Sequence, residues 1–252
     1  MKGNEMIKAK EEVLTAYEET KTNVDVSHAN TLFYKIKVFL SSLKRRGVVG
    51  TIKKMLMYYD FYRKGVDFSS ENLFELTLVG EHKEHGTAYL QNSYEVVEKI
   101  IKEIRKLNPK VKEGAFLDYG SGKGLPMIIA QREGFKRVIG VEFAVELYET
   151  SLLNMRRLGI ENFELHNLDA AFYTPPKDVS LIFMFNPFDH VVMEKVSEKI
   201  VSQKDSFVND VYIAYVNPTC NFVFTKDDNY EFIENVIFET GEIANIFKLK
   251  KD

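Results

Sequence analysis

A glycine-rich turn carries the residues with the clearest chemical potential. Between an apolar run and a helical pattern, the chain reads Asp118-Tyr119-Gly120-Ser121-Gly122-Lys123-Gly124. Three alternate glycines permit positive φ angles and let the backbone approach a bound molecule closely. A carboxylate at the start of the turn disfavours an anionic ligand and favours a cationic one. The turn therefore predicts a site for a ligand with a cationic group. Its predicted contacts are Asp118, Gly120, Ser121, Gly122 and Gly124.

Two further carboxylates follow the next two apolar runs of the chain. Glu142 ends the run 137–142, and Asp169 follows the run 162–167. In a parallel sheet such positions meet at the carboxyl edge, where ligands bind. Glu142 can accept hydrogen bonds from both hydroxyls of an adenosine ribose. Asp169 is placed to accept from the adenine amino group, with Phe143 and Leu168 on either side of the ring. The three acids together favour a cationic nucleoside.

A nicotinamide-dependent oxidoreductase is the competing interpretation of a glycine-rich turn. The dinucleotide fingerprint is Gly-x-Gly-x-x-Gly. Here Leu125 stands three residues after Gly122, where the third glycine belongs. The sequence also shows no recognisable hydride-relay pair. Both observations disfavour an oxidoreductase.

The elements that must position these residues alternate between strands and helices. Apolar runs predict strands at 115–119, 137–142, 162–167, 179–185 and 211–216, and helical periodicity predicts helices that begin at Ser93, 125, 145 and 191. Residues 230–238 and 243–249 flank Thr240-Gly241 and are typical of a hairpin. This alternation predicts right-handed crossovers and a doubly wound α/β sheet that is covered on both faces.

Residues 93–250 resemble the class I S-adenosylmethionine-dependent methyltransferases, through the Asp-x-Gly-x-Gly-x-Gly turn and the two acids that follow it. The resemblance implies a Rossmann-like domain at 93–252 with a seven-stranded, mostly parallel sheet and a C-terminal antiparallel hairpin. It implies S-adenosyl-L-methionine as the cofactor and methyl transfer as the activity. It also implies that the glycine turn holds the methionyl part, Glu142 the ribose and Asp169 the adenine.

The motif Asn186-Pro187-Phe188 follows the fourth predicted strand. It resembles the (Asn/Asp)-Pro-Pro-aromatic motif of superfamily members that methylate nitrogen, but has one proline where that motif has two. The side-chain oxygen of Asn186 and the carbonyl of Pro187 can accept hydrogen bonds from an amine and turn its lone pair toward the methyl group. Phe188 can stack on the acceptor. The motif favours a nitrogen acceptor in a protein lysine or a small-molecule amine. The alternative is a proline-stabilised turn.

Two further residues are candidates for a catalytic role at the methyl acceptor. Residues 65–68 and Gly86-Thr87-Ala88-Tyr89 resemble the region upstream of the core in protein-lysine methyltransferases that lack a SET domain, where such a segment closes over the cofactor. That resemblance places Tyr89 near the transferring methyl, the alternative being that Tyr89 packs on the sheet. His190 follows the Asn-Pro-Phe motif and can remove a proton near neutral pH.

The two histidines before the helix that begins at Ser93 are candidates for a metal site. His82 and His85 stand beside Glu81 and Glu84, which would suit a metal ion. No further ligand cluster is evident, so we expect a polar loop and no metal.

The composition sets outer limits on function. The chain has 252 residues, 45% of them hydrophobic and 28% charged, with a net charge of −3. The single cysteine excludes an intramolecular disulfide. No apolar run approaches the ~18–20 residues of a membrane span, and residues 1–21 lack the apolar centre of a signal peptide, so we expect a cytoplasmic protein. Without a global basic field, nucleic acid is disfavoured as a partner.

Residues 26–59 are strongly basic, with seven cations and no Asp or Glu. Apolar residues recur there at helical spacing, with a break expected after Arg45-Arg46-Gly47. We interpret residues 1–92 as a helical extension followed by a mostly irregular connector. We expect its helices to pack on the catalytic domain. The alternatives are peripheral contact with an anionic membrane, and a catalytically inactive S-adenosylmethionine-binding module that engages a partner through these helices.

Overall fold

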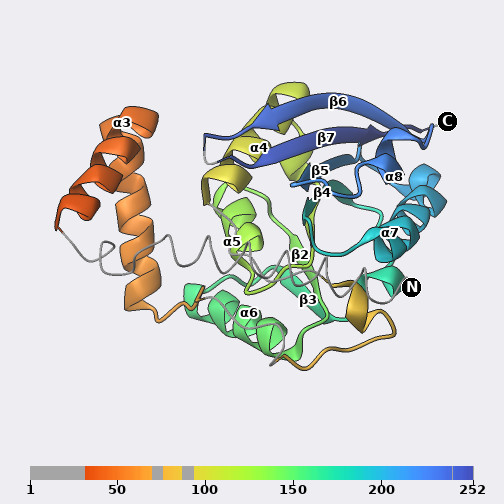
Figure 1. The fold of residues 1–252 in the computed structure, drawn as a ribbon, viewed down its shortest axis with the longest axis horizontal. Coiled ribbons are helices and arrows are strands. Elements are labelled where there is room, and N and C mark those ends of the chain that lie inside the picture. The colour runs from red at the N-terminus through yellow and green to blue at the C-terminus, as the bar shows by residue number, and fades with distance from the viewer. Residues whose placement is uncertain (1–31, 70–75, 87–93, 240, 252) are drawn as a thin grey trace, which may run out of the picture. The chain divides into compact units, whose positions relative to one another are not determined.

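The computed structural model describes residues 32–69, 76–86, 94–239 and 241–251 (Figure 1). The chain divides into two compact units, residues 1–62 and 63–252, and each is described by itself. The predicted domain boundary after residue 92 stays a prediction, because residues 87–93 lie outside the described ranges.

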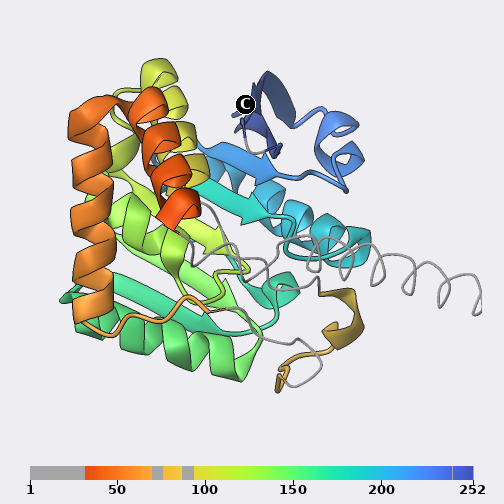
Figure 2. The ribbon, with the colours of Figure 1, turned by 60° about the vertical axis from the view of Figure 1, so that its left-hand side comes forward.

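A seven-stranded sheet forms the centre of the second unit (Figures 1 and 2). Its strands are β1 (Ala115–Tyr119), β2 (Val138–Glu142), β3 (Phe163–Asn167), β4 (Val179–Phe185), β5 (Tyr212–Val216), β6 (Tyr230–Ile237) and β7 (Ile243–Leu249). Their order is β3-β2-β1-β4-β5-β7-β6. Strands β1 to β5 pair in parallel, whereas β7 runs antiparallel to both β5 and β6. The predicted doubly wound sheet with a C-terminal hairpin is confirmed.

The strand order has its switch point between β1 and β4. Strand β1 pairs with β2 on one side and with β4 on the other, so the chain reverses its direction of winding between them. In open α/β sheets, ligands bind beyond the carboxyl ends of the strands at this switch point. The glycine turn and the Asn-Pro-Phe motif leave the sheet here.

The helices cover both faces of the sheet, as predicted. They are α4 (Tyr94–Leu107), α5 (Leu125–Arg132), α6 (Val145–Leu158), α7 (His190–Ser202) and α8 (Phe222–Thr225), with single 3₁₀ turns at η2 (Lys83–His85), η3 (Val111–Glu113), η4 (Ala170–Phe172) and η5 (Lys204–Ser206). In Figure 1, α4, α5 and α6 lie on one side of the sheet, and α7 and α8 on the other. The start of α7 follows from its sequence, since the side chain of Asp189 accepts a hydrogen bond from Val191 N at 2.9 Å and caps the helix.

Apolar patterning explains why these elements form. Strand β4 reads VSLIFMF, and its four central residues, 181–184, have no exposed surface. A strand buried on both faces reads as one continuous apolar run. Helix α4 buries only one stripe, which includes Val97, Ile100 and Ile104, and leaves its charged face in solvent.

The first unit contains α3 (Leu32–Arg63), a helix interrupted at Gly47. Gly47 has φ 67°, which a residue with a side chain rarely adopts, and Thr51 Oγ1 donates to its carbonyl at 2.8 Å. The predicted break at this glycine is confirmed. Among the described residues, no helix is long and apolar enough to cross a membrane.

Candidate functional site

The glycine turn has the backbone that its sequence predicts. Gly120, Gly122 and Gly124 have φ angles of 73°, 52° and 85°. A Cβ atom at Gly120 would lie 2.4 Å from Cβ of Pro187, and one at Gly124 would lie 2.4 Å from the hydroxyl oxygen of Ser151. Because no such atom fits, glycine is required here both for backbone angle and for space. The contact with Pro187 also brings the turn against the Asn-Pro-Phe motif.

Asp118 is a buried acid below this turn. It is 1% exposed, and among the described residues its Oδ2 atom has no hydrogen-bond partner. Burial raises the pKa of Asp118 well above its usual range, and the nearby charge of Glu142 raises that pKa further. The Ser121 hydroxyl is likewise buried and has no partner within the described ranges. Unpartnered buried polar groups are costly, so they indicate a place where a ligand brings a donor or a positive charge.

Glu142 ties the end of β2 to the glycine turn. Its Oε2 accepts from Gly122 N at 2.8 Å, and its Oε1 accepts from Ala144 N at 2.9 Å. Burial raises the pKa of Glu142, while these backbone hydrogen bonds act in the opposite direction. Each carboxylate oxygen can accept a second hydrogen bond. Glu142 can therefore hold the turn in place and still accept from the two hydroxyls of a ribose.

Asp169 is already engaged by the chain itself. Its Oδ1 accepts from Ala171 N at 3.0 Å and caps η4. Its Oδ2 accepts from the backbone N of Glu81 at 3.2 Å and of His82 at 3.1 Å, and lies 2.7 Å from His82 Nδ1. Burial alone would raise the pKa of Asp169, but the hydrogen bonds from His82 and Ala171 lower it overall. The carboxylate predicted to bind adenine thus binds residues 81–82 in this structure.

Residues 76–86, which we call the strap, cross the carboxyl ends of three strands. After β2, Leu78 forms an antiparallel bridge with Ala144. After β4, Gly86 forms a second such bridge with Phe188. Between these two points the strap contacts Asp169 after β3. Sequence analysis predicted a polar, irregular segment here, and the strap is irregular apart from η2.

A buried lysine joins the turn to an earlier part of the chain. The side chain of Lys123 is fully buried, and its Nζ lies 2.9 Å from Asp67 Oδ2 and 3.0 Å from Ser69 Oγ. Asn154 on α6 accepts from Asp67 N and donates to the Lys123 carbonyl. Sequence analysis missed this role of Lys123, since a lysine between two glycines gives no signal of burial. The acid in the segment 65–68 was the one available hint.

The residues predicted to enclose the adenine ring lie at the ends of β2 and β3. Phe143 is half-buried, and a Cβ atom at Gly86 would lie 2.3 Å from its Cζ, so the strap touches the ring. Leu168 is half-buried, and its backbone N donates to the Glu142 carbonyl at 3.1 Å. Their contact with an adenine ring stays a prediction.

Asn186 has an unusual backbone conformation at the end of β4. Its φ is 41°, and Asn217 at the end of the neighbouring strand β5 has φ 49°. Left-handed residues other than glycine are uncommon and cluster at functional sites. The Asn186 Oδ1 accepts from the hydroxyls of Thr219 at 2.6 Å and Tyr215 at 3.4 Å. These contacts fix the orientation of the amide beside the glycine turn.

The other members of the predicted acceptor site are placed differently. Phe188 is 5% exposed and packs edge-on against Tyr119, with centroids 6.5 Å apart. Its ring fills the core and is closed to an acceptor in this conformation. His190 is exposed at the first residue of α7, and Tyr89 lies outside the described residues. Within the described part of the chain, no three His, Cys, Asp or Glu residues are grouped to hold a metal ion.

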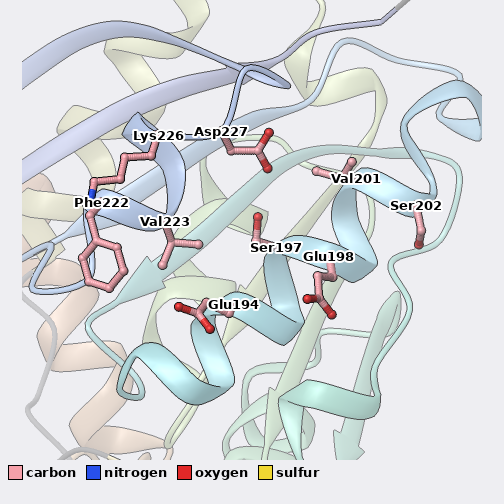
Figure 3. Close-up of a pocket in the computed structure, with 9 residues that line it drawn as sticks. All are labelled: Glu194, Ser197, Glu198, Val201, Ser202, Phe222, Val223, Lys226 and Asp227. Atoms are coloured by element: carbon pink, nitrogen blue, oxygen red, sulfur yellow. The ribbon is translucent and has the colours of Figure 1, made fainter.

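A pocket of about 550 Å³ lies elsewhere, between α7 and α8 (Figure 3). Helix α7 contributes Glu194, Ser197, Glu198, Val201 and Ser202, and the other wall is formed by Phe222, Val223, Lys226 and Asp227. None of the predicted site residues lines it. The pocket is therefore separate from the glycine turn.

Solved structures of methyltransferases resemble this fold. No protein-family model and no curated protein matches the chain. A candidate methyltransferase from Escherichia coli matches at 14% identity and a TM-score of 0.51, over 62% of this chain and 88% of that one. A candidate RNA methyltransferase from Pyrococcus horikoshii matches at 15% identity and a TM-score of 0.51, over 70% of this chain and 94% of that one. An RNA methyltransferase from Salinibacter ruber, solved with S-adenosyl-L-homocysteine, matches at 16% identity and a TM-score of 0.49, over 65% and 95%.

The two structures with a TM-score of 0.51 show the fold. Together with the strand order, they establish that residues 63–252 have the fold of the class I S-adenosylmethionine-dependent methyltransferases. The resemblance stated from the sequence is confirmed at the level of fold.

Proposed function

We propose that this chain is an S-adenosylmethionine-dependent methyltransferase whose cofactor binds at the carboxyl ends of β1, β2 and β3. The observation that carries the proposal is Asp118, a buried carboxyl with an unpartnered oxygen below a turn of three left-handed glycines. This combination fits a ligand that brings positive charge close to the backbone. It lies at the switch point of the sheet, where such folds bind their ligands.

Each part of the cofactor has a candidate partner in this chain. The glycine turn and Asp118 would hold the cationic methionyl part, and the Glu142 carboxylate would accept from the ribose hydroxyls. Asp169 would accept from the adenine amino group, with Phe143 and Leu168 beside the ring. The cofactor supplies a methyl group that is already activated on a sulfonium. The work left to the protein is to orient the acceptor, exclude water and free its lone pair.

The acceptor is proposed to be a nitrogen. Pro187 lies against the glycine turn, and the Asn186 amide beside it is held by Thr219. The Pro187 carbonyl can accept a hydrogen bond from an amine. Asn186 Oδ1 can do the same when the amine replaces one of the two hydroxyls that it binds in this structure, and the two acceptors would then orient the amine for in-line attack. A protein lysine and a small-molecule amine both fit. A matched structure with a TM-score of 0.51 carries the name of a candidate RNA methyltransferase. The expectation that nucleic acid is disfavoured is therefore not supported, and the amines of nucleobases fit as well.

A calorimetric titration with S-adenosyl-L-homocysteine tests the cofactor. We expect saturable binding, whereas NADH should produce none. Circular dichroism should show that the protein is folded in both titrations. A protein that is folded and binds neither compound, both as the wild type and with the His82→Ala change described below, would refute the proposal.

Transfer of a labelled methyl group to a cell extract tests the activity. The label should enter a fraction that is then sorted by its sensitivity to protease and to ribonuclease. Binding without transfer to protein, nucleic acid or small molecules would instead support the inactive binding module.

A further inference from the structure

We infer that the strap is an autoinhibitory element, in which His82 occupies Asp169 in place of the adenine amino group. The inference rests on the proposed function, because it concerns the same nucleoside site. It adds that the cofactor must displace the His82 side chain before its base can reach Asp169.

One of the hydrogen bonds on Asp169, that from the His82 ring, resembles the bond that an adenine amino group would make. A carboxylate oxygen has two lone pairs, and the Oδ2 atom already meets three donors, namely two backbone N–H groups and the Nδ1 of His82. The imidazole is a flat ring that presents an N–H to the carboxylate, as an adenine amino group would. The Oδ2 atom therefore has no capacity left for a nucleoside.

The imidazole also lies in an aromatic environment. Its ring centroid lies 5.9 Å from that of Phe172 and 5.9 Å from that of His85. The side chain of His82 is only 12% exposed. A planar ring with one nitrogen on the carboxylate thus lies beside Asp169, where the proposed function expects the base.

The backbone of the strap closes the remaining space above the carboxylate. Gly80 has φ 91°, and a Cβ atom there would lie 2.4 Å from Asp169 Cβ. A Cβ atom at Gly86 would likewise lie 2.3 Å from Cζ of the Phe143 ring. The strap therefore contacts both the predicted partner of the adenine amino group and a predicted wall of the base site.

The ends of the strap are held by contacts that do not involve Asp169, whereas residues 81–82 in its middle bind Asp169 itself. One end forms the Val79 N to Phe143 carbonyl hydrogen bond at 2.9 Å. At the other end, His85 Nδ1 lies 2.7 Å from Asp189 Oδ2, and these side chains are 25% and 41% exposed. The backbone N of Asp189 also donates to the His85 carbonyl at 2.9 Å. A ligand that binds Asp169 directly can therefore displace the middle of the strap while its ends remain attached.

Binding of S-adenosyl-L-homocysteine to three variants tests the inference. His82→Ala removes the competing ring, and we expect its Kd to fall about tenfold, because a competing closed state lowers apparent affinity by the fraction of open molecules. His82→Gln keeps a side-chain donor and should stay closer to the wild type. Lys83→Ala is the matched control, since Lys83 is an exposed residue of the same strap, and its Kd should not change.

Hydrogen exchange at the backbone amides of Glu81 and His82 provides the second measurement. Both donate to Asp169 in the free protein. Addition of S-adenosyl-L-homocysteine should accelerate their exchange if the strap is displaced. Slower exchange would show that the strap closes over the ligand and would overturn the inference.

The binding outcomes separate the two proposals. Unchanged or weaker binding by a folded His82→Ala variant would mean that His82 supports Asp169, and would overturn the inference alone. Absence of binding in the wild type and in all three variants, each folded by circular dichroism, would overturn the proposed function. Binding by His82→Ala but not by the wild type would be the strongest support for autoinhibition.

Discussion

Replacement of Asp118 by asparagine should stabilise the unliganded protein, and the gain should grow with pH. Asp118 is buried, and its raised pKa means that the folded chain keeps this proton at pH values where the unfolded chain has lost it. Folding therefore takes up a proton, so stability decreases as pH rises. Asparagine has nearly the same shape and does not titrate, and the variant should lack this contribution.

The size of the effect follows from proton linkage. An aspartate in an unfolded chain has a pKa of about 3.9. Above that pH, and below the raised pKa of the folded state, each pH unit lowers stability by about 1.4 kcal/mol. Two pH units within this window amount to about 2.7 kcal/mol, or roughly 5–10 °C in Tm for a chain of this size.

Urea denaturation of both proteins at pH 4, 5 and 6 measures the effect. The free energy of unfolding of Asp118→Asn should approach that of the wild type at pH 4 and exceed it progressively at higher pH. The same variant should bind S-adenosylmethionine more weakly, because the ligand loses a group that can become an anion. A difference in stability that does not change with pH would show that Asp118 is ionised in the folded protein, and would refute the reasoning.

Three other changes test the site. Glu142→Ala should weaken binding of S-adenosyl-L-homocysteine by about 1.5–3 kcal/mol, the range for hydrogen bonds to a charged group, and calorimetry showing equal affinity would exclude a ribose contact. Asp67→Asn should lower the free energy of unfolding by about 1–3 kcal/mol in urea denaturation, because the buried Lys123 ammonium loses its carboxylate; a loss within error would mean that other groups compensate this charge. Gly120→Ala should lower the free energy of unfolding by about 1–2 kcal/mol because of the positive φ. It should lower it further because the new Cβ atom would lie 2.4 Å from Cβ of Pro187. Gly159→Ala is the control, since Gly159 has φ 68° and a Cβ atom there would have no neighbour within 4 Å. Equal losses of unfolding free energy for the two variants in urea denaturation would contradict the close approach of Gly120 to Pro187.

The sheet and the glycine turn were predictable because their signals are local. The predicted strand 179–185 coincides with β4, and the helix predicted to begin at residue 145 begins there as α6. Continuous apolar runs and helical periodicity are direct consequences of burial on two faces or on one. The alternate glycines likewise identified a backbone that only glycine adopts readily.

The contacts across the strand ends were not predictable from such patterns. The strap has no periodicity, and His82 meets Asp169 across 87 positions of the chain. The Asn-Pro-Phe motif was a local signal, yet it gave no sign that Phe188 points into the core while Asn186 turns left-handed. Side-chain direction at the end of a strand depends on what packs above it. Here that is a segment with no sequence signature of its own.

The pairing of Asp67 with Lys123 bears on where this domain begins. A shortened chain starting at Tyr94 would retain all seven strands, but the buried Lys123 ammonium would lose Asp67 and the Asp169 carboxylate would lose three hydrogen-bond donors. Such a fragment would have to take water into its interior or lose the shape of the turn. In energetic terms, Asp67 and residues 81–82 belong to this domain, even though they add no strand to its sheet.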